Sequence, residues 1–338
     1  MSDGLTYSES GVDINAGEAA VEKIKGAIRS TYTKGVVSEI GGFGGAFEID
    51  KQEYDSPVLI STTDGVGTKA VVAGECRQVD TIGLDLVAMC VDDLVCVGAK
   101  PLFMLDYISI GKVDPDYIER IVSGIAKGCK LAGAALIGGE MAEHSGEFAP
   151  GHFDLAGFAV GIVEKERILG SENILGDEVL IGLSSPGIRS NGYTLARKAL
   201  LSDAGLHYED ELYPGSTVSE ALLEPSVIYA PLVTSLIASF RQGIRSIAHV
   251  TGGGLLSNLT RVIPPNSKPI VDRDSWEVPK VFKVIQEVGH IETEEMYRVF
   301  NMGIGMVMAV TREIKDEVLK GIEKSEYEAQ EIGHLSKI

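Results

Sequence analysis

The stretch GLDLVAMCVDDLVCVGAKPLFMLDY, Gly83 to Tyr107, decides how the rest of the chain is interpreted. Plotted at about 100° per residue, Asp85, Asp92 and Asp93 fall within roughly one quarter of a helix circumference, and apolar residues fill the remainder. Such a helix is buried nearly all round, and buried carboxylates are costly unless cations, hydrogen-bond donors or a metal meet them. The Ala-Lys-Pro segment that follows ends the helix, and the apolar run up to Tyr107 predicts a buried strand.

The three acids of this helix have open alternatives. Asp85 is either an N-terminal helix cap or a functional acid, and Asp92 is either a paired structural acid or a functional one. We expect Asp93 to be a metal ligand. The helical wheel alone does not rank Asp92 against Asp93, because both lie in the same sector.

Length, charge and cysteine usage limit the class of protein. The chain has 338 residues, which suits two domains, and we expect these at 1–168 and 169–338. Its 30 basic and 49 acidic side chains give a net charge of −19, which argues against a nucleic-acid or membrane partner. Four cysteines without CxxC spacing predict free thiols, and no targeting or membrane-spanning segment is visible, so we expect a cytoplasmic protein.

Polar and glycine-rich loops follow several predicted strands of the first half. The strand 58–62 leads into TTDGVGTK, which places the carboxylate of Asp64, the hydroxyl of Thr68 and the ammonium of Lys69 in one turn, a combination typical of a metal–phosphate site. The segment 40–47 has four glycines, as a phosphate-binding loop needs, but flexible turns share this composition. Another strand ends in Gly-Gly-Glu, with Glu140 as a further carboxylate.

The second half has two junctions at which a strand meets glycines and then a helix. Residues 184–193 contain Arg-Ser-Asn-Gly before a predicted helix, and residues 248–255 run through Thr-Gly-Gly-Gly into another. Backbone N–H groups at such junctions favour anions. His249 is more typical of a packed strand residue than of an acid or base. The first half has the order strand, helix, strand, helix, strand, strand, which predicts an α+β arrangement.

Taken together, these motifs resemble the aminoimidazole ribonucleotide synthetase family of purine biosynthesis. The resemblance covers nearly the whole chain and rests on GVDINAG, GGFGGAF, TTDGVGTK, TIGLDLVAMCVDDLVCVGAKPLF, GGE, DLAGFAVG, SNGYTLARK, HVTGGGL and MYRVFNMGIGM. It implies two domains, an N-terminal mixed sheet or half-barrel with helices and a C-terminal α/β sandwich. It also implies a homodimer that shares a barrel between subunits.

The resemblance implies an ATP-dependent ring closure of formylglycinamidine ribonucleotide, with Mg²⁺ as the metal. The formyl oxygen is phosphorylated, and the amidine nitrogen then displaces phosphate. Phosphoryl transfer depends mainly on positioning and charge neutralisation. The catalytic positions that it implies are Asp64, Lys69 and Asp93, and the metal positions are Asp64, Asp93 and Glu140. The implied ATP-binding set is Lys25, Gly42, Gly44, Gly45, Asp64, Thr68 and Lys69, and the implied substrate and phosphate set is Arg189, Ser190, Asn191, Gly192, Thr251, Gly252, Gly253 and Gly254.

This chain departs from the family pattern at three places. Arg189 stands where the family often has histidine, which favours a cationic phosphate contact there. Met141 departs from the commoner Gly-Gly-Glu-Thr motif, and Ser257 and Thr260 replace a glutamate and a proline. We therefore assign no general base. The alternatives are a selenophosphate synthetase, a thiamine-phosphate kinase, or a nucleotide-binding regulator without turnover.

Overall fold

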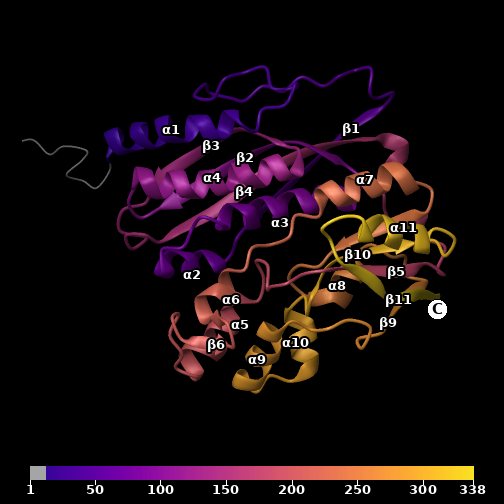
Figure 1. Cartoon of the computed structure of the whole chain (residues 1–338). Coiled ribbons are helices and arrows are strands. Elements are labelled where there is room, and N and C mark those ends of the chain that lie inside the picture. Colours follow the sequence, from indigo (N-terminus) through magenta and orange to yellow (C-terminus); the bar gives the residue numbers. More distant parts are fainter. Residues whose placement is uncertain (1–12) are drawn as a thin grey trace, which may run out of the picture.

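The computed structural model describes residues 13–338, and residues 1–12, with the start of the GVDINAG motif, lie outside the described part. The chain forms one sheet in each half (Figure 1). The first half contains α1 (Ile14–Arg29), β1 (Pro57–Gly65), α2 (Lys69–Cys76), α3 (Ile82–Cys96), β2 (Lys100–Ile110), α4 (Pro115–Ala132), β3 (Ala135–Glu143) and β4 (Phe153–Glu164).

Two short 3₁₀ turns, η1 (Lys165–Arg167) and η2 (Ser171–Asn173), join the halves. The second half contains β5 (Val179–Ser184), α5 (Tyr193–Arg197), the π-helical η3 (Lys198–Asp203), β6 (Glu211–Tyr213), β7 (Ser216–Thr217), α6 (Val218–Leu223), α7 (Ala230–Phe240), β8 (Ile244–His249), α8 (Gly254–Thr260), β9 (Ser267–Val271), α9 (Lys280–Gly289), α10 (Thr293–Val299), β10 (Ile304–Val310), α11 (Lys315–Glu323) and β11 (Ala329–Lys337).

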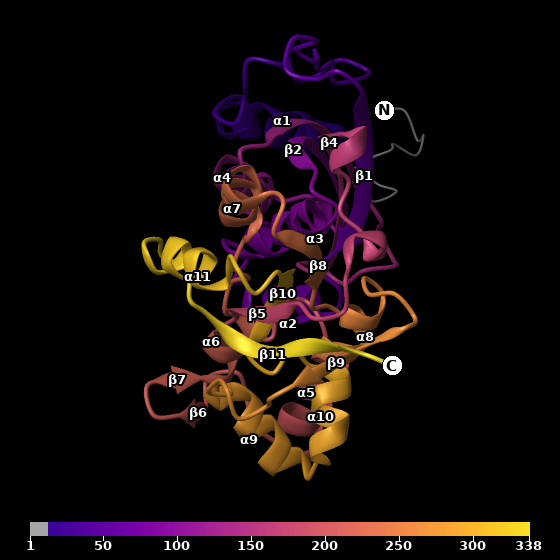
Figure 2. The same cartoon turned by 90° about the vertical axis from the view of Figure 1, so that its right-hand side faces the viewer.

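The first sheet is mixed and curled into a half-barrel. Its order is β1-β4-β2-β3, and only β2 and β3 run parallel. Helices α3 and α4 pack on one face, and α1 packs beside α4 and β3 (Figure 2). On the opposite face, Phe47 covers Phe103 with 5.4 Å between ring centroids, whereas Leu59, Tyr107 and Phe158 are exposed. The sheet therefore has one closed face and one largely open apolar face.

The second sheet is antiparallel, in the order β8-β10-β5-β11-β9, and is covered on both faces. Every residue of β10 is buried. Because successive side chains of a strand point to opposite faces, Met306 and Met308 join the main hydrophobic core, whereas Val307 and Ala309 join a second, smaller core. This arrangement explains the continuous apolar run in the sequence and produces the expected α/β sandwich.

The two halves meet along α3. The helix contacts α7 and β8 of the second half, and Figures 1 and 2 both show α7 lying against the first half. We call this contact region the seam. Its buried helix is the one expected from Gly83 onward, with all positions from Ile82 to Asp92 buried. Within residues 13–338, no helix is long and apolar enough to cross a membrane.

Some local expectations need correction. Lys69 is the first residue of α2 and not part of an open turn, because the helix begins directly after Thr68. Strand β3 extends to Glu143, so Glu140 lies within a strand and not in a loop after it. Strand β8 ends at His249, earlier than expected, and Gly253 adopts a positive φ of 96° at the start of α8. Strand β9 had no strong alternating pattern and was not foreseen.

Candidate active site

Strand β1 delivers Asp64 to the seam. Its carboxylate accepts a hydrogen bond of 2.7 Å from the Gly65 N–H and lies on the sheet face that carries α3. Burial, together with the negative charge of Asp93, raises the pKa of Asp64, although the Gly65 N–H opposes this shift. Two like charges close together in a partly buried site are relieved by a cation. The pair is therefore suited to hold a divalent metal ion.

Asp93 is the end of a chain of hydrogen bonds that crosses the seam. Its Oδ1 lies 2.8 Å from His249 Nδ1, and His249 Nε2 lies 2.8 Å from Arg189 Nη2. Since a guanidinium only donates, Nε2 accepts and the proton of the neutral ring is assigned to Nδ1, which donates to Asp93. Both ring nitrogens are thus occupied, so His249 orients Asp93 and is not free to move a substrate proton.

Asp92 and Asp93 are neighbours in sequence with different environments. Asp92 is fully buried and accepts from Arg189 Nη2 at 3.1 Å and from the N–H groups of Tyr229 and Ala230 at 2.8 and 3.0 Å. Burial raises its pKa against these contacts. The side chain of Asp93 is 41% exposed. Asp92 is therefore a structural acid that caps the start of α7, and Asp93 is the one open to a ligand.

Arg189 and Lys69 are not placed to contact a phosphate. Lys69 is fully buried, and its ammonium donates to Asp85 at 2.8 Å and to the Glu224 carbonyl at 2.7 Å. Burial lowers the pKa of Lys69. Asp85 also accepts from the N–H and hydroxyl of Ser226, so it is a paired acid inside the helix and not a cap. Arg189 is 1% exposed and bound to Asp92 and His249. We leave both cations out of the phosphate-binding set.

Three of the predicted loops converge at the seam. A Cβ added at Gly67 would lie 3.4 Å from the Ser190 carbonyl, and one at Gly252 would lie 3.4 Å from Asn191 Oδ1. Ser190 Oγ and Asn191 Nδ2 are buried without a hydrogen-bond partner among residues 13–338. These polar groups suit a polar ligand beside Asp64.

The glycine junctions themselves are sterically required. Gly192, Gly253 and Gly254 have φ angles of 82°, 96° and 69°, and a Cβ at Gly254 would lie 2.0 Å from the Tyr297 carbonyl. Asn258, which the sequence did not single out, donates from its amide to the carbonyls of Thr251, Gly252 and Gly254. The loop is thus held in one shape with Thr251 bonded to the same Asn258 side chain.

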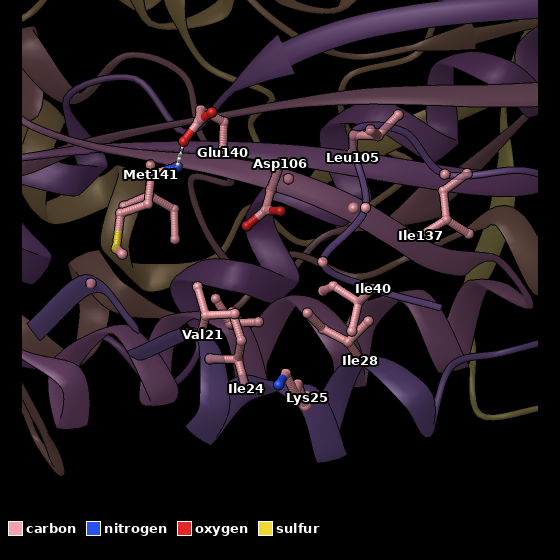
Figure 3. Close-up of a pocket in the computed structure, with 18 of the residues that line it drawn as sticks. Val21, Ile24, Lys25, Ile28, Ile40, Leu105, Asp106, Ile137, Glu140 and Met141 are labelled. Atoms are coloured by element: carbon pink, nitrogen blue, oxygen red, sulfur yellow. Dashed lines mark hydrogen bonds between the residues drawn. The ribbon is translucent and has the colours of Figure 1, made fainter. Parts of the chain in front are cut away.

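A separate pocket of about 660 Å³ lies between α1 and the first sheet (Figure 3). We call it the α1 pocket. It brings together Lys25, the glycine loop with Gly42, Gly44 and Gly45, and the strand residues Asp106 and Glu140. Its remaining walls are mainly apolar, from Val21, Ile24, Ile28, Ile108, Ile118, Val122 and Ile137. Apolar walls with a few convergent polar groups are typical of a site for a small molecule.

Glu140 does not join Asp64 and Asp93. In the sheet order, β1 and β3 are at opposite edges, and Glu140 pairs with Tyr107 while Gly139 pairs with Asp106. The Glu140 carboxylate points away from α1 and accepts from the Met141 N–H at 2.8 Å (Figure 3). Among residues 13–338 there is no group of three or more His, Cys, Asp or Glu side chains that fits a metal ion. Asp64 and Asp93 remain as the predicted acids that lie together in the described part, and two carboxylates fit Mg²⁺, which usually takes one or two of them plus phosphate oxygens and water.

Comparison with known proteins agrees with this architecture. The family model described as AIR synthase related protein, N-terminal domain, matches residues 50–163, and the model for the C-terminal domain matches residues 176–337. Two solved structures share the fold at low identity. The hydrogenase maturation protein HypE in complex with ATP has a TM-score of 0.68 at 16% identity, covering 98% of this chain and 89% of that one. Thiamine-monophosphate kinase from Stenotrophomonas maltophilia has 0.64 at 19%, covering 95% and 94%.

Much closer relatives match over nearly their whole length. A protein of Trichlorobacter lovleyi named phosphoribosylformylglycinamidine cyclo-ligase is 48% identical over 98% of this chain and 95% of its own. A protein of the same name from Geobacter metallireducens is 47% identical over 99% and 96%. The motifs that converge at the seam, the two-sheet fold and this identity lead to one conclusion: the chain belongs to the phosphoribosylformylglycinamidine cyclo-ligase family.

Proposed function

We propose that the chain converts formylglycinamidine ribonucleotide to aminoimidazole ribonucleotide, using ATP and releasing ADP and phosphate. The observation that carries this proposal is the exposed, oriented carboxylate of Asp93 beside Asp64, in a seam that also gathers the Ser190–Gly192 and Thr251–Gly254 loops. The named relatives at 48% and 47% identity support the same reaction.

The acid pair has the charge that phosphoryl transfer needs. Asp64 and Asp93 would hold Mg²⁺, which neutralises the phosphate oxygens of ATP when it is bound. His249 keeps Asp93 in place through its Nδ1–H, and Arg189 fixes the ring from the other side. The chain's own contribution at this point is orientation, because a rigid acid pair need not reorganise when the phosphate arrives.

The substrate is placed by the two glycine junctions. Ser190 and Asn191 supply polar atoms without a partner in the described part, and Gly252 and Gly253 are exposed residues of the loop held by Asn258. We propose that these groups bind the ribonucleotide and its phosphate. The ring then closes when the amidine nitrogen attacks the activated formyl carbon and phosphate leaves. Exclusion of water at this stage would protect the phosphorylated intermediate.

We propose that ATP enters by the α1 pocket, with Lys25 and the Gly42–Gly45 loop near its phosphates and the Thr68 hydroxyl at the seam. Two solved structures that share this fold, HypE in complex with ATP and Thermotoga maritima PurL complexed with AMPPCP, support nucleotide binding. Asp64, Gly157 and Asp106 lie side by side on three neighbouring strands. At ~4.8 Å per strand, the Cα atoms of Asp64 and Asp106 are about 10 Å apart. Side chains from β2 and α3 fill the space above Gly157, so ATP cannot run straight from Asp106 to Asp64. We therefore propose that the glycine loop moves when ATP binds and guides the phosphates past α3 to the acid pair.

We also propose a cytoplasmic homodimer formed through the open face of the first sheet. Leu59, Tyr107 and Phe158 are 54%, 40% and 42% exposed on that face, and an exposed apolar patch of this kind is typical of an interface. Glu140 lies on the same face, so it would meet the partner subunit. Sedimentation of wild type and Phe158→Glu would test the dimer.

We place the domain boundary at 168/169, between the two family matches, and we propose no nucleic-acid or membrane partner.

The reaction is tested by following phosphate release from MgATP and formation of aminoimidazole ribonucleotide in one tube. Wild type should give coupled phosphate and product, and Asp93→Ala should lower both by about 100-fold or more. If well-folded wild type binds ATP but releases no phosphate with this substrate, the cyclo-ligase activity is refuted and a regulator without turnover is favoured.

A further inference from the structure

Asp106 is a carboxyl group without a partner in an apolar environment. It lies on β2 between Met104 and Ile108, which are 0% and 2% exposed and share its face of the sheet. In Figure 3 its carboxyl points into the α1 pocket, toward α1. No side chain or N–H group of another residue in 13–338 donates a hydrogen bond to it. Asp106 is half-buried, and a carboxyl group that opens into a mainly apolar pocket with no donor from another residue can offer its hydrogen-bonding groups to a ligand.

The neighbouring strand leaves this carboxyl free to face the pocket. Gly139 is opposite Asp106 in the β2–β3 register, and a Cβ there would lie 1.9 Å from Asp106 Oδ1. Any other residue at 139 would push the carboxyl out of its place. The Gly-Gly-Glu motif thus has a function in this chain that is separate from Glu140, since its second glycine makes room for Asp106.

The surroundings favour the neutral form of Asp106. The charged groups around the pocket are Glu18, Glu22 and Lys25 of α1, Glu39 before the glycine loop and Glu140 of β3. Helix α4 presents the apolar Ile118 and Val122, and its buried Cys129 thiol is the titratable group of this helix near Asp106. Lys25 is paired with Glu22 at 2.5 Å. No cation pairs with Asp106, and burial raises its pKa to about 7. A neutral carboxyl carries an O–H donor and a C=O acceptor side by side.

We propose that Asp106 in its neutral form recognises the base of ATP, donating its O–H to adenine N1 and accepting from the N6 amino group. The proposal rests on the proposed function, because it places ATP in the α1 pocket. The apolar walls from α1, α4 and β3 suit the faces of a planar base, and the Asp106 carboxyl points into the same pocket. Asp106 is then a specificity-determining residue, and the adenine edge is what satisfies it.

The proposal predicts different results for an amide and a truncation. Asp106→Asn keeps a donor beside an acceptor, so it should bind MgATP about as well as wild type does at pH 6. Asp106→Ala loses both, and MgATP affinity should fall by about tenfold to 100-fold. If only the neutral acid binds, wild-type affinity should fall by about 30-fold from pH 6 to pH 8.5, whereas Asp106→Asn should show no such loss.

The measurement is titration calorimetry of the full chain with MgATP and with the magnesium complex of purine riboside triphosphate, which lacks the N6 amino group. Comparing Asp106→Asn with wild type removes the titration of the nucleotide itself. Wild type should prefer ATP, and Asp106→Ala should lose that preference. Asp203→Asn, an exposed acid paired with Lys198, controls for the change of charge and should behave as wild type.

The outcomes separate this proposal from the proposed function. Failure of wild type to bind MgATP would refute the nucleotide site altogether. Normal MgATP binding with unchanged base preference and unchanged pH dependence in Asp106→Ala would refute only the role of Asp106. Equal losses in Asp106→Asn and Asp106→Ala would also refute it, since they would show that the ionised carboxylate is the form required. Circular dichroism of each variant verifies that the fold is intact.

Discussion

The acids of the seam and the acid of the α1 pocket differ in whether other residues pair with them. In the seam, Asp85 is paired with Lys69 and Ser226, and Asp92 is paired with Arg189 and two N–H groups. In the pocket, Asp106 has mainly apolar neighbours, and no other residue of the described part donates a hydrogen bond to it. A paired buried acid contributes to the fold, because removal of its partner leaves an uncompensated charge in the interior and destabilises the folded state. An unpaired acid is a candidate for a ligand, and this distinction separates structure from function in the molecule.

The largest expected effect is on the free energy of unfolding, when the buried cation Lys69 is removed from the seam. Lys69→Met should destabilise the fold by about 3–5 kcal/mol, because it leaves Asp85 buried and unpaired. Urea unfolding measures this loss. The double variant Lys69→Met/Asp85→Leu should recover part of it, since the uncompensated charge is gone. Unchanged stability of Lys69→Met with weakened ATP binding would instead return Lys69 to the phosphate site.

The next effect concerns the exposed acid of the same helix. Asp93→Asn should lower kcat by about 100-fold to 1000-fold with little change in unfolding free energy, since its side chain is 41% exposed and holds no part of the core. Steady-state kinetics and urea unfolding of the same preparation give both quantities. Asp203→Asn is the matched control on the surface. A variant with a lower free energy of unfolding and an unchanged kcat would show that Asp93 is a structural acid like Asp92.

The pocket acid should make stability depend on pH. Burial raises the pKa of Asp106 from an ordinary 3.8 to about 7, so the folded state binds the proton more tightly and its stability falls as pH rises between these values. Asp106→Asn removes this penalty and should be more stable than wild type at pH 8 by about 1–3 kcal/mol, allowing for water in the pocket. Below pH 4 the two should be alike. Thermal unfolding at both pH values checks the difference, and equal stability at pH 8 would contradict it.

The smallest effect is expected at the rim of the pocket. Lys25→Met should raise the KM for MgATP by about tenfold and leave stability nearly unchanged, because Lys25 is part-exposed and its partner Glu22 is on the surface. Lys23→Met, on the same helix but paired with Asp116 and Glu119, is the control. An equal rise of KM in both variants would show that the overall charge of α1 affects MgATP binding and that Lys25 makes no specific contact.

Much of the architecture follows from the sequence alone. Apolar periodicity predicts the α3 helix, and the uninterrupted apolar run from Ile304 to Val310 predicts a strand buried on both faces. The ordered motifs also predict the family. Local signals also place Asp64 at a strand end, Asp93 on the buried helix and the glycines at two junctions, and their functional roles stay predictions.

The tertiary structure decided which charged groups are free. Asp92 and Asp93 share a helical sector, yet Asp92 alone is held by distant groups, which are Arg189, 97 residues away in sequence, and the N–H groups of Tyr229 and Ala230. Lys69 looked like a phosphate ligand until the chain folded it onto Asp85, and Glu140 looked like a metal ligand until β3 placed it on the other face of the sheet. Asp106 was missed because an acid in a strand gives no signal of its own. Pairing and burial depend on residues that are far apart in the chain, whereas a sequence pattern reports only on residues that are close together in it.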